Sequence, residues 1–182
     1  LTGTSGVDGV MVFGRSRAKV GPTFGVNNGR VNLEVRGGAE IVAPWSNWNG
    51  AAKGNIRITS GAHAEMRGST AHDGWQSGAG ISSSDGSVLV SRGSVANLQA
   101  IEIYRPRASA ITVRRSFISM LEADIQELSY GGFITTGKAI YIQDGSIISA
   151  AGVTVDGVAM TRSRTSTGLI GCMTEDGVIF DG

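Results

Sequence analysis

The chain has 182 residues, and its 28 glycines, about twice the ordinary usage, disfavour a helix-rich architecture. Apolar residues make up 41% of the chain, enough for a substantial core, and the 17% charged residues with only 3 prolines exclude a disordered or proline-rich linker. The formal net charge of +1 supplies no global field, so nucleic acid is not expected as a partner.

The remaining composition also restricts the chemistry. The single cysteine, Cys172, cannot form an internal disulfide, and no Cys/His cluster has zinc-ligand spacing, so neither a metal nor another cofactor is expected. No apolar run is long enough to span a bilayer and no signal peptide is present, so membrane insertion is not expected. Because no methionine precedes Leu1, we expect the chain to be a fragment of a longer protein.

An internal repeat organises the chain from about residue 10 to residue 157. Six segments align without a gap, and their steps are 23, 23, 32, 23 and 29 residues. Two of these steps therefore contain insertions, of nine and six residues. The residues at the centres of the six segments are Arg15, Gly38, Gly61, Gly93, Ser116 and Gly145.

Apolar residues recur in columns on both sides of these centres. Five residues before the centres stand Val10, Leu33, Ile56, Val88, Ile111 and Ile140, and three before them stand Val12, Val35, Ile58, Val90, Val113 and Ile142. Three residues after the centres stand Ala18, Ile41, Ala64, Ala96, Ser119 and Ile148, and five after them stand Val20, Ala43, Met66, Leu98, Leu121 and Ala150. Period-two alternation around a small residue predicts two strand halves joined by a bend, with all four columns facing the core.

The repeat predicts an all-β protein built as a parallel β-helix of about six coils. A step of 23 residues accommodates about three short strands and three turns, and stacking such units places equivalent residues about 4.8 Å apart in parallel register. The leucine-rich repeat and the Ca²⁺-binding nonapeptide are excluded, because their motifs are absent. We assign residues 1–157 to the coils, and residues 158–182 to a terminal coil, a cap or the start of another segment, because the pattern ends after Asp156.

Residues 119–132 allow two predictions. A helix is favoured by Ser119 as N-cap, by Glu122 in a capping box and by the stop at Gly131 and Gly132. A strand is favoured because Leu121 falls in a core column. We favour the strand, since stacking commonly overrides local propensity.

Two polar segments contain the three tryptophans and could bind a sugar. Aromatic faces stack on the apolar side of a sugar ring, while amides and carboxylates bond its hydroxyls. Residues 44–50 and the insertion near residues 71–76 combine these groups. The alternatives are a tryptophan packed in the core or at a subunit interface, and an insertion without function. The predicted ligand-binding residues are Trp45, Asn47, Trp48, His72 and Trp75.

Candidate catalytic carboxylates are few. Glycan cleavage needs two of them, about 5 to 5.5 Å apart for retention or about 6.5 to 9.5 Å for inversion. Glu122 and Asp124 would share one face of a strand, and Asp73 and Glu102 are isolated candidates. Ordinary solvated acids are the stronger interpretation, so the catalytic residues stay unassigned.

One basic cluster could bind an acidic polysaccharide or pair with the carboxylates Glu102 and Glu122 on adjacent coils, and we favour the pairing. Its members are Arg105, Arg107, Arg114 and Arg115.

Three segments of the repeat resemble the stacked coils of bacteriophage tailspikes and tail fibres. They are SRGSVANL at residues 91–98, QDGSIISAAGVTVDG at residues 143–157 and SGAHAEMRGS at residues 60–69. The resemblance implies a homotrimeric, extracellular spike on the virion that binds or cleaves bacterial surface polysaccharide. It transfers no catalytic residue, because the shared motif consists of core and turn positions.

Three functions from different classes follow. We favour a fragment of a tailspike or tail fibre that attaches to the host cell by binding polysaccharide, or that forms the stem joined to the remainder of the spike. A polysaccharide depolymerase, either a glycoside hydrolase or a lyase acting on capsule, O-antigen or exopolysaccharide, ranks second. A bacterial surface adhesin ranks third.

Overall fold

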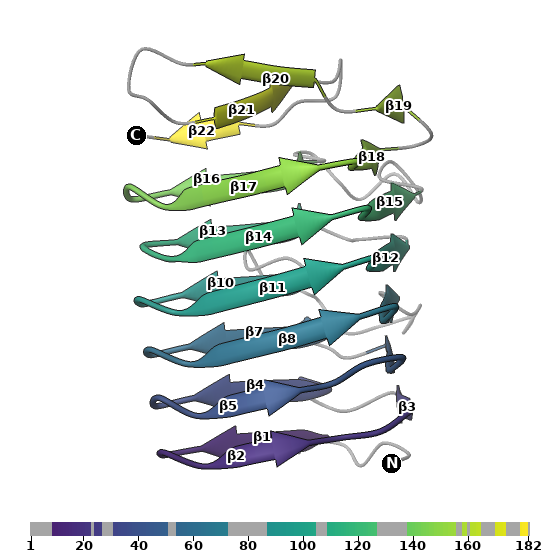
Figure 1. Ribbon diagram of the computed structural model, residues 1–182, viewed down its shortest axis with the longest axis vertical. Coiled ribbons are helices and arrows are strands. Elements are labelled where there is room, and N and C mark those ends of the chain that lie inside the picture. The colour runs from purple at the N-terminus through teal and green to yellow at the C-terminus, as the bar shows by residue number, and fades with distance from the viewer. Residues whose placement is uncertain are drawn as a thin grey trace, which may run out of the picture.

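The computed structural model describes residues 9–22, 24–26, 31–50, 54–72, 87–104, 109–126, 138–155, 158–159, 161–164, 170–173 and 179–181. Over these residues the protein is all-β and contains no helix (Figure 1). The chain passes six times through three sheets in the same order, and one such pass is called a coil below. Within coils 1 to 6 every strand pairs in parallel with its equivalents in the neighbouring coils, as predicted.

The strands of each sheet come from successive coils. The first sheet contains β1 (Val10–Phe13), β4 (Leu33–Arg36), β7 (Ile56–Thr59), β10 (Val88–Ser91), β13 (Ser109–Arg114), β16 (Lys138–Gln143) and β22 (Ile179–Asp181). The second sheet contains β2 (Arg17–Lys19), β5 (Glu40–Val42), β8 (His63–Arg67), β11 (Val95–Gln99), β14 (Phe117–Leu121) and β17 (Ile147–Ala151). The third sheet contains β3 (Phe24–Val26), β6 (Asn47–Asn49), β9 (Thr70–His72), β12 (Glu102–Tyr104), β15 (Asp124–Gln126), β18 (Thr154–Val155) and β19 (Val158–Ala159).

The pairing of the first sheet confirms the register predicted from the repeat. Val10 lies opposite Leu33, Leu33 lies opposite Ile56, and the column continues to Ile140. The two columns before the centres face the core, in which only Val10 of the first coil is partly rather than fully buried. Because the side-chain period of a strand is two, a shift of one residue would have turned both columns outward.

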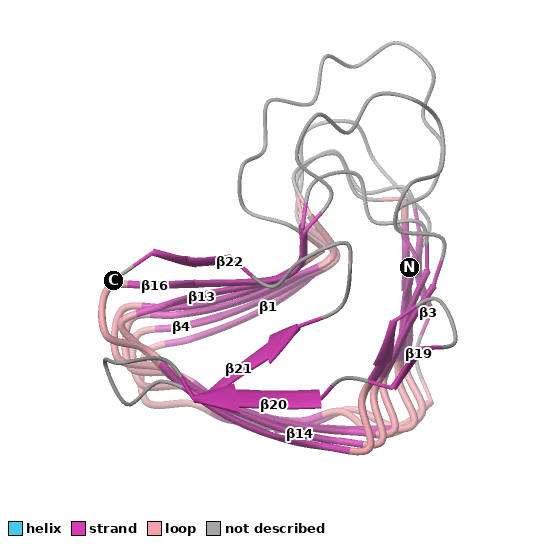
Figure 2. Ribbon diagram, turned by 90° about the horizontal axis from the view of Figure 1, so that it is seen from above, coloured by secondary structure: helices cyan, strands magenta, loops and turns pink. Residues whose placement is uncertain are grey.

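Side chains from all three sheets form one hydrophobic core. Ile58 of the first sheet, Ile118 of the second and Ile103 of the third are all buried in the same cluster. Figure 2, which looks along the stack, shows the three sheets along three sides of it. The core cluster draws on residues of all three sheets. Burial of each such side chain contributes about 1.5 to 3 kcal/mol.

The predicted register is wrong by one residue in the second strand of coil 5. Ile118 lies opposite Ala96, and Met120 lies opposite Leu98, so Ser119 and Leu121 point outward instead of into the core.

The cause is a shorter turn. In coil 4 two residues with left-handed backbone, Arg92 (φ 58°) and Gly93 (φ 74°), connect β10 to β11, whereas in coil 5 only Arg115 (φ 49°) lies in this region. Ser116 consequently aligns with Ser94 rather than with Gly93. A hydrogen bond from the amide N–H of Ser94 to Ser116 Oγ joins the two aligned residues.

Residues 119–126 form the end of β14, a turn and β15, so the strand prediction is confirmed over this range. Residues 127–132, the rest of the proposed helix, lie outside the described residues.

Several buried asparagine and serine side chains form hydrogen bonds from coil to coil along the stack. Asn32 Nδ2 donates to Asn55 Oδ1 of the next coil at 2.7 Å. At the turn between the first and second sheets, the Ser94 and Ser116 N–H groups donate to the serine hydroxyls of the following coils, Ser116 and Ser146. These ladders allow serine and asparagine residues at the corners of the core, since the donors that form them have partners in the next coil.

The strand arrangement changes after Val155. β19 pairs antiparallel with β18, and β20 (Thr161–Arg164) pairs antiparallel with β21 (Ile170–Met173). β22 then pairs in parallel with β16, at the end of the first sheet.

Candidate functional site

Among the described residues, Trp45 is the one tryptophan with an exposed side chain. It lies in the turn between β5 and β6 with a φ of 56°, and 61% of its surface is exposed. Its amide N–H donates to the carbonyl of Arg67 in coil 3, which fixes the turn to the next coil. The indole lies against Gly68, where an added Cβ would come within 2.1 Å of ring carbon Cζ3. The ring is therefore supported from one side and open to solvent on the other.

The expectation that Trp48 binds a ligand is wrong, because this side chain is wholly buried in the core. Trp48 is the middle residue of the three-residue strand β6, and its side chain points inward. Its neighbours in the third sheet are Gly25 and Ala71, whose small size leaves space for the indole. The prediction failed because a three-residue strand was interpreted as a turn.

The outer face of the third sheet collects polar side chains from several coils, and we call it the polar face. Asn47, Glu102, Asp124 and Thr154 share one row of this face, because their strands pair in register through Thr70. A second row contains Tyr104 and Gln126. Period-two alternation in the third strand of each coil could have indicated these positions, but strands of three residues carry too short a pattern to be recognised. The described side chains of the polar face are Asn47, Glu102, Tyr104, Asp124, Gln126 and Thr154.

Glu102 and Asp124 lie on neighbouring strands of the polar face, at directly opposite positions. Thr154 Oγ1 donates to Asp124 Oδ1, and Gln126 Nε2 donates to Asp124 Oδ2, so both oxygens of this carboxylate are held. Glu102 is exposed to solvent. The arrangement offers one fixed and one adaptable acceptor of hydrogen bonds about 4.8 Å apart along the stack.

The proposed pairing of Glu122 with Asp124 on one strand is wrong. β14 ends at Leu121 and β15 begins at Asp124, so Glu122 stands in the intervening turn with a φ of 55°. Its side chain packs near Gly152 of the next coil, where an added Cβ would lie 3.5 Å from Glu122 Cγ.

Other candidates are placed only in part. His72 ends β9 and lies opposite Tyr104 in register. Asp73 and Trp75 lie outside the described residues, in the connection from β9 to β10. Among the described residues, no group of three or more His, Cys, Asp or Glu side chains is placed to hold a metal ion. Nor do the described residues include an apolar helix of membrane-spanning length.

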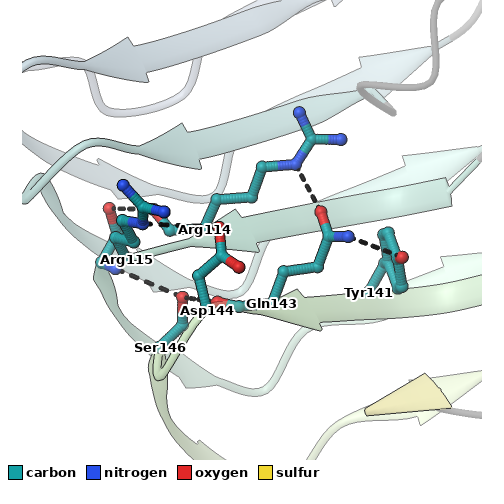
Figure 3. A network of polar contacts seen from close by, with 7 residues as sticks. Arg114, Arg115, Tyr141, Gln143, Asp144 and Ser146 are labelled. Carbon is teal, nitrogen blue, oxygen red and sulfur yellow. Dashed lines mark hydrogen bonds and ion pairs between the residues drawn. The ribbon is translucent and has the colours of Figure 1, made fainter. Parts of the chain in front are cut away.

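The described arginines of the basic cluster pair differently from the prediction (Figure 3). Arg114 Nε donates to Gln143 Oε1, and Arg115 Nε lies 3.5 Å from Asp144 Oδ2. Gln143 in turn donates to the hydroxyl of Tyr141 at 2.6 Å. Tyr141 and Gln143 belong to β16 of the first sheet and Asp144 to the turn that follows it, whereas Glu102 belongs to the third sheet. Arg105 and Arg107 lie outside the described residues.

Comparison of the chain with protein-family models, curated proteins and solved structures gives no match.

Proposed function

We propose that the six coils form a parallel β-helix that binds bacterial surface polysaccharide through the polar face and Trp45, within a phage tailspike or tail fibre. The observation that carries this proposal is the row of hydrogen-bonding side chains on neighbouring strands of the third sheet, next to an exposed indole. The resemblance of the repeat to tailspike coils supplies the class of ligand and the extracellular, virion location.

The row of the polar face is chemically suited to a sugar. Asn47 supplies an amide that can both donate and accept, while Glu102 and Asp124 supply acceptors for hydroxyl groups. Trp45 lies two residues before Asn47 in the chain, and its exposed indole can stack on the apolar side of a sugar ring. A polymer fits better than a single sugar, because equivalent groups recur from coil to coil.

Binding of purified host-cell polysaccharide to immobilised chain tests the proposal. Trp45→Ala and Glu102→Gln should each weaken binding about tenfold, which corresponds to about 1.4 kcal/mol. Phe13→Ala is the matched control, because Phe13 is as exposed as Trp45, at 59% against 61%, and lies on the first sheet. Equal binding by wild type, Trp45→Ala and Glu102→Gln would reject the polar face as the site.

Cleavage of the polysaccharide is the second candidate, favoured by the neighbouring carboxylates Glu102 and Asp124. In a glycoside hydrolase this spacing suits retention, with one carboxylate as the nucleophile and the other as acid and then base. In a lyase the two groups would act as base and acid. Release of reducing ends by wild type, and its loss in both Glu102→Gln and Asp124→Asn, would establish the depolymerase. If the polysaccharide is bound but no product is released, the depolymerase is rejected and attachment remains the proposed function.

We further propose that the spike consists of three copies of the chain, joined to the remainder of the tail, with the coils acting as a stem as well as a binding surface. Sedimentation equilibrium measures the stoichiometry directly, and a monomer at micromolar concentration would count against this assembly. A bacterial surface adhesin is the alternative source of the same architecture, and the genes that flank the parent gene would distinguish a prophage from a secretion locus.

A further inference from the structure

The outer face of the second sheet changes character between its two halves (Figure 1 looks onto this sheet). In coils 1 to 3 six of the seven outward positions carry an ionisable side chain, namely Arg17, Lys19, Glu40, His63, Glu65 and Arg67, and the seventh is Val42. In coils 4 to 6 none of the nine outward positions does; they are Val95, Asn97, Gln99, Phe117, Ser119, Leu121, Ile147, Ser149 and Ala151. We call this second half the uncharged face.

The side chains of the uncharged face also differ in size from one row to the next. Val95, Phe117 and Ile147 lie opposite one another on consecutive strands and form an apolar ridge, in which Ile147 is 59% exposed. Two residues further along the strands, the smaller side chains of Asn97, Ser119 and Ser149 form a parallel valley. Leu121, 42% exposed, and Ala151 lie beyond the valley.

We infer that the uncharged face is the contact surface for a further copy of this chain. Depletion of charge at the centre and exposed large apolar side chains distinguish an interface core from ordinary protein surface. The carboxylates that the polar face offers to sugar hydroxyls are absent from the outward positions of this face. The inference names the surface of the self-assembly proposed above and rests on that proposal for its occupant.

The period of the coils makes another copy the fitting occupant. Ridge and valley both repeat at the coil spacing of about 4.8 Å, and a second copy of the chain has the same spacing in its own ridge and valley. The ridge of one copy can therefore lie in the valley of the next over three successive coils. If each of two copies places its ridge in the valley of the other, the contact gives a dimer. If each copy places its ridge in the valley of the next copy around an axis, the contact closes a ring of three.

The size of the face limits the strength of the contact. Three strands of five residues cover roughly 16 by 14 Å, well below the ~800 Å² that each partner buries in a standard interface. Self-association through this face alone is therefore expected to be weak, and measurable by sedimentation from low micromolar to submillimolar concentration. Neighbouring surfaces of the two copies would have to add to it in a stable spike.

A matched pair of substitutions tests the inference. Ile147 and Phe13 are both 59% exposed, so Ile147→Lys and Phe13→Lys perturb the fold equally little but lie on different sheets. Ile147→Lys should weaken self-association at least about tenfold, since an unpaired charge would enter an apolar contact. Phe13→Lys should leave it unchanged. A wild-type chain that stays monomeric throughout, or equal losses in both variants, would overturn the inference.

A third variant separates a shaped contact from general stickiness. Ser149 is exposed in the valley, and Ser149→Phe adds apolar surface while it fills the space that the ridge would occupy. Weaker association of Ser149→Phe supports the ridge-in-valley contact, whereas stronger association would contradict it. Polysaccharide binding by these variants should be unchanged, because the polar face belongs to the third sheet, so a failure of the glycan proposal is recognisable on its own.

Discussion

The indole of Trp45 occupies the space that a Cβ atom at position 68 would need. The position of this coil 2 side chain therefore depends on the glycine at position 68 in coil 3. The two positions are equivalent in consecutive coils, and both have left-handed backbone, with φ of 56° and 59°. Gly68 thus supports the one exposed tryptophan that the structure describes.

Gly68→Ala should displace this indole. Gly61→Ala is the matched control, because Gly61 also has positive φ, 75°, but no atom within 4 Å of an added Cβ. Both substitutions should cost roughly 1–2 kcal/mol from the backbone alone. Only Gly68→Ala should also change the tryptophan fluorescence and weaken polysaccharide binding, and its excess destabilisation should vanish in the Trp45→Ala background. Identical behaviour of the two glycine variants would contradict the packing of Trp45 on Gly68.

Truncation of a core isoleucine should be far more costly than truncation of an exposed one. Ile111 is wholly buried in the first sheet, and Ile147 is mostly exposed on the second. Ile111→Ala should lower the free energy of unfolding by about 2–5 kcal/mol, and Ile147→Ala by less than about 0.5 kcal/mol. Urea unfolding at a concentration where the chain is monomeric gives both values. Comparable losses would mean that the columns before the centres do not face the core.

An inserted glycine should be tolerated in the turn of coil 5 but not in its strand. Between Arg115 and Ser116 it would restore the two-residue turn that Arg92 and Gly93 form in coil 4, so the stability should change by less than about 1 kcal/mol. Between Ile118 and Ser119 it would turn Met120 out of the core and cost several kcal/mol. Thermal unfolding of the two insertion variants measures this difference in stability. Equal melting temperatures would refute the assigned register.

Loss of a serine hydroxyl from the corner ladder should destabilise the stack. Ser116 Oγ accepts from the buried N–H of Ser94 and donates to the carbonyl of Arg114. Ser116→Ala leaves that N–H without its partner, which should cost about 1–3 kcal/mol. Ser149→Ala is the control, since Ser149 is exposed on the second sheet. A Ser116→Ala variant as stable as the control would show that water replaces the hydroxyl.

The sequence was informative where the pattern was long and apolar. The columns from Val10 to Ile142 were placed in the correct register because two core residues per strand, repeated six times, outweigh local ambiguity. One missing turn residue at Arg115 was enough to displace the next strand, since a gap-free alignment cannot locate a deletion inside a turn. Trp48 was misplaced because its strand has only three residues, too few to show alternation.

The polar face could not be assembled from the sequence for a different reason. Glu102 and Asp124 are 22 residues apart, and their proximity depends on the one-residue change in coil 5 together with the third sheet, whose strands gave no periodic signal. The candidate acids were therefore paired by nearness in the chain, which joined Glu122 to Asp124 across what is a turn.

Both long steps of the repeat fall at the same corner of the stack. The chain between His72 and Val88, and that between Gln126 and Lys138, each leads from the third sheet to the first. The turns between the first and second sheets, by contrast, differ by a single residue from coil 4 to coil 5. Length can thus be added at one corner without altering the pairing of any strand, which makes that corner the natural place to graft a foreign loop onto the scaffold.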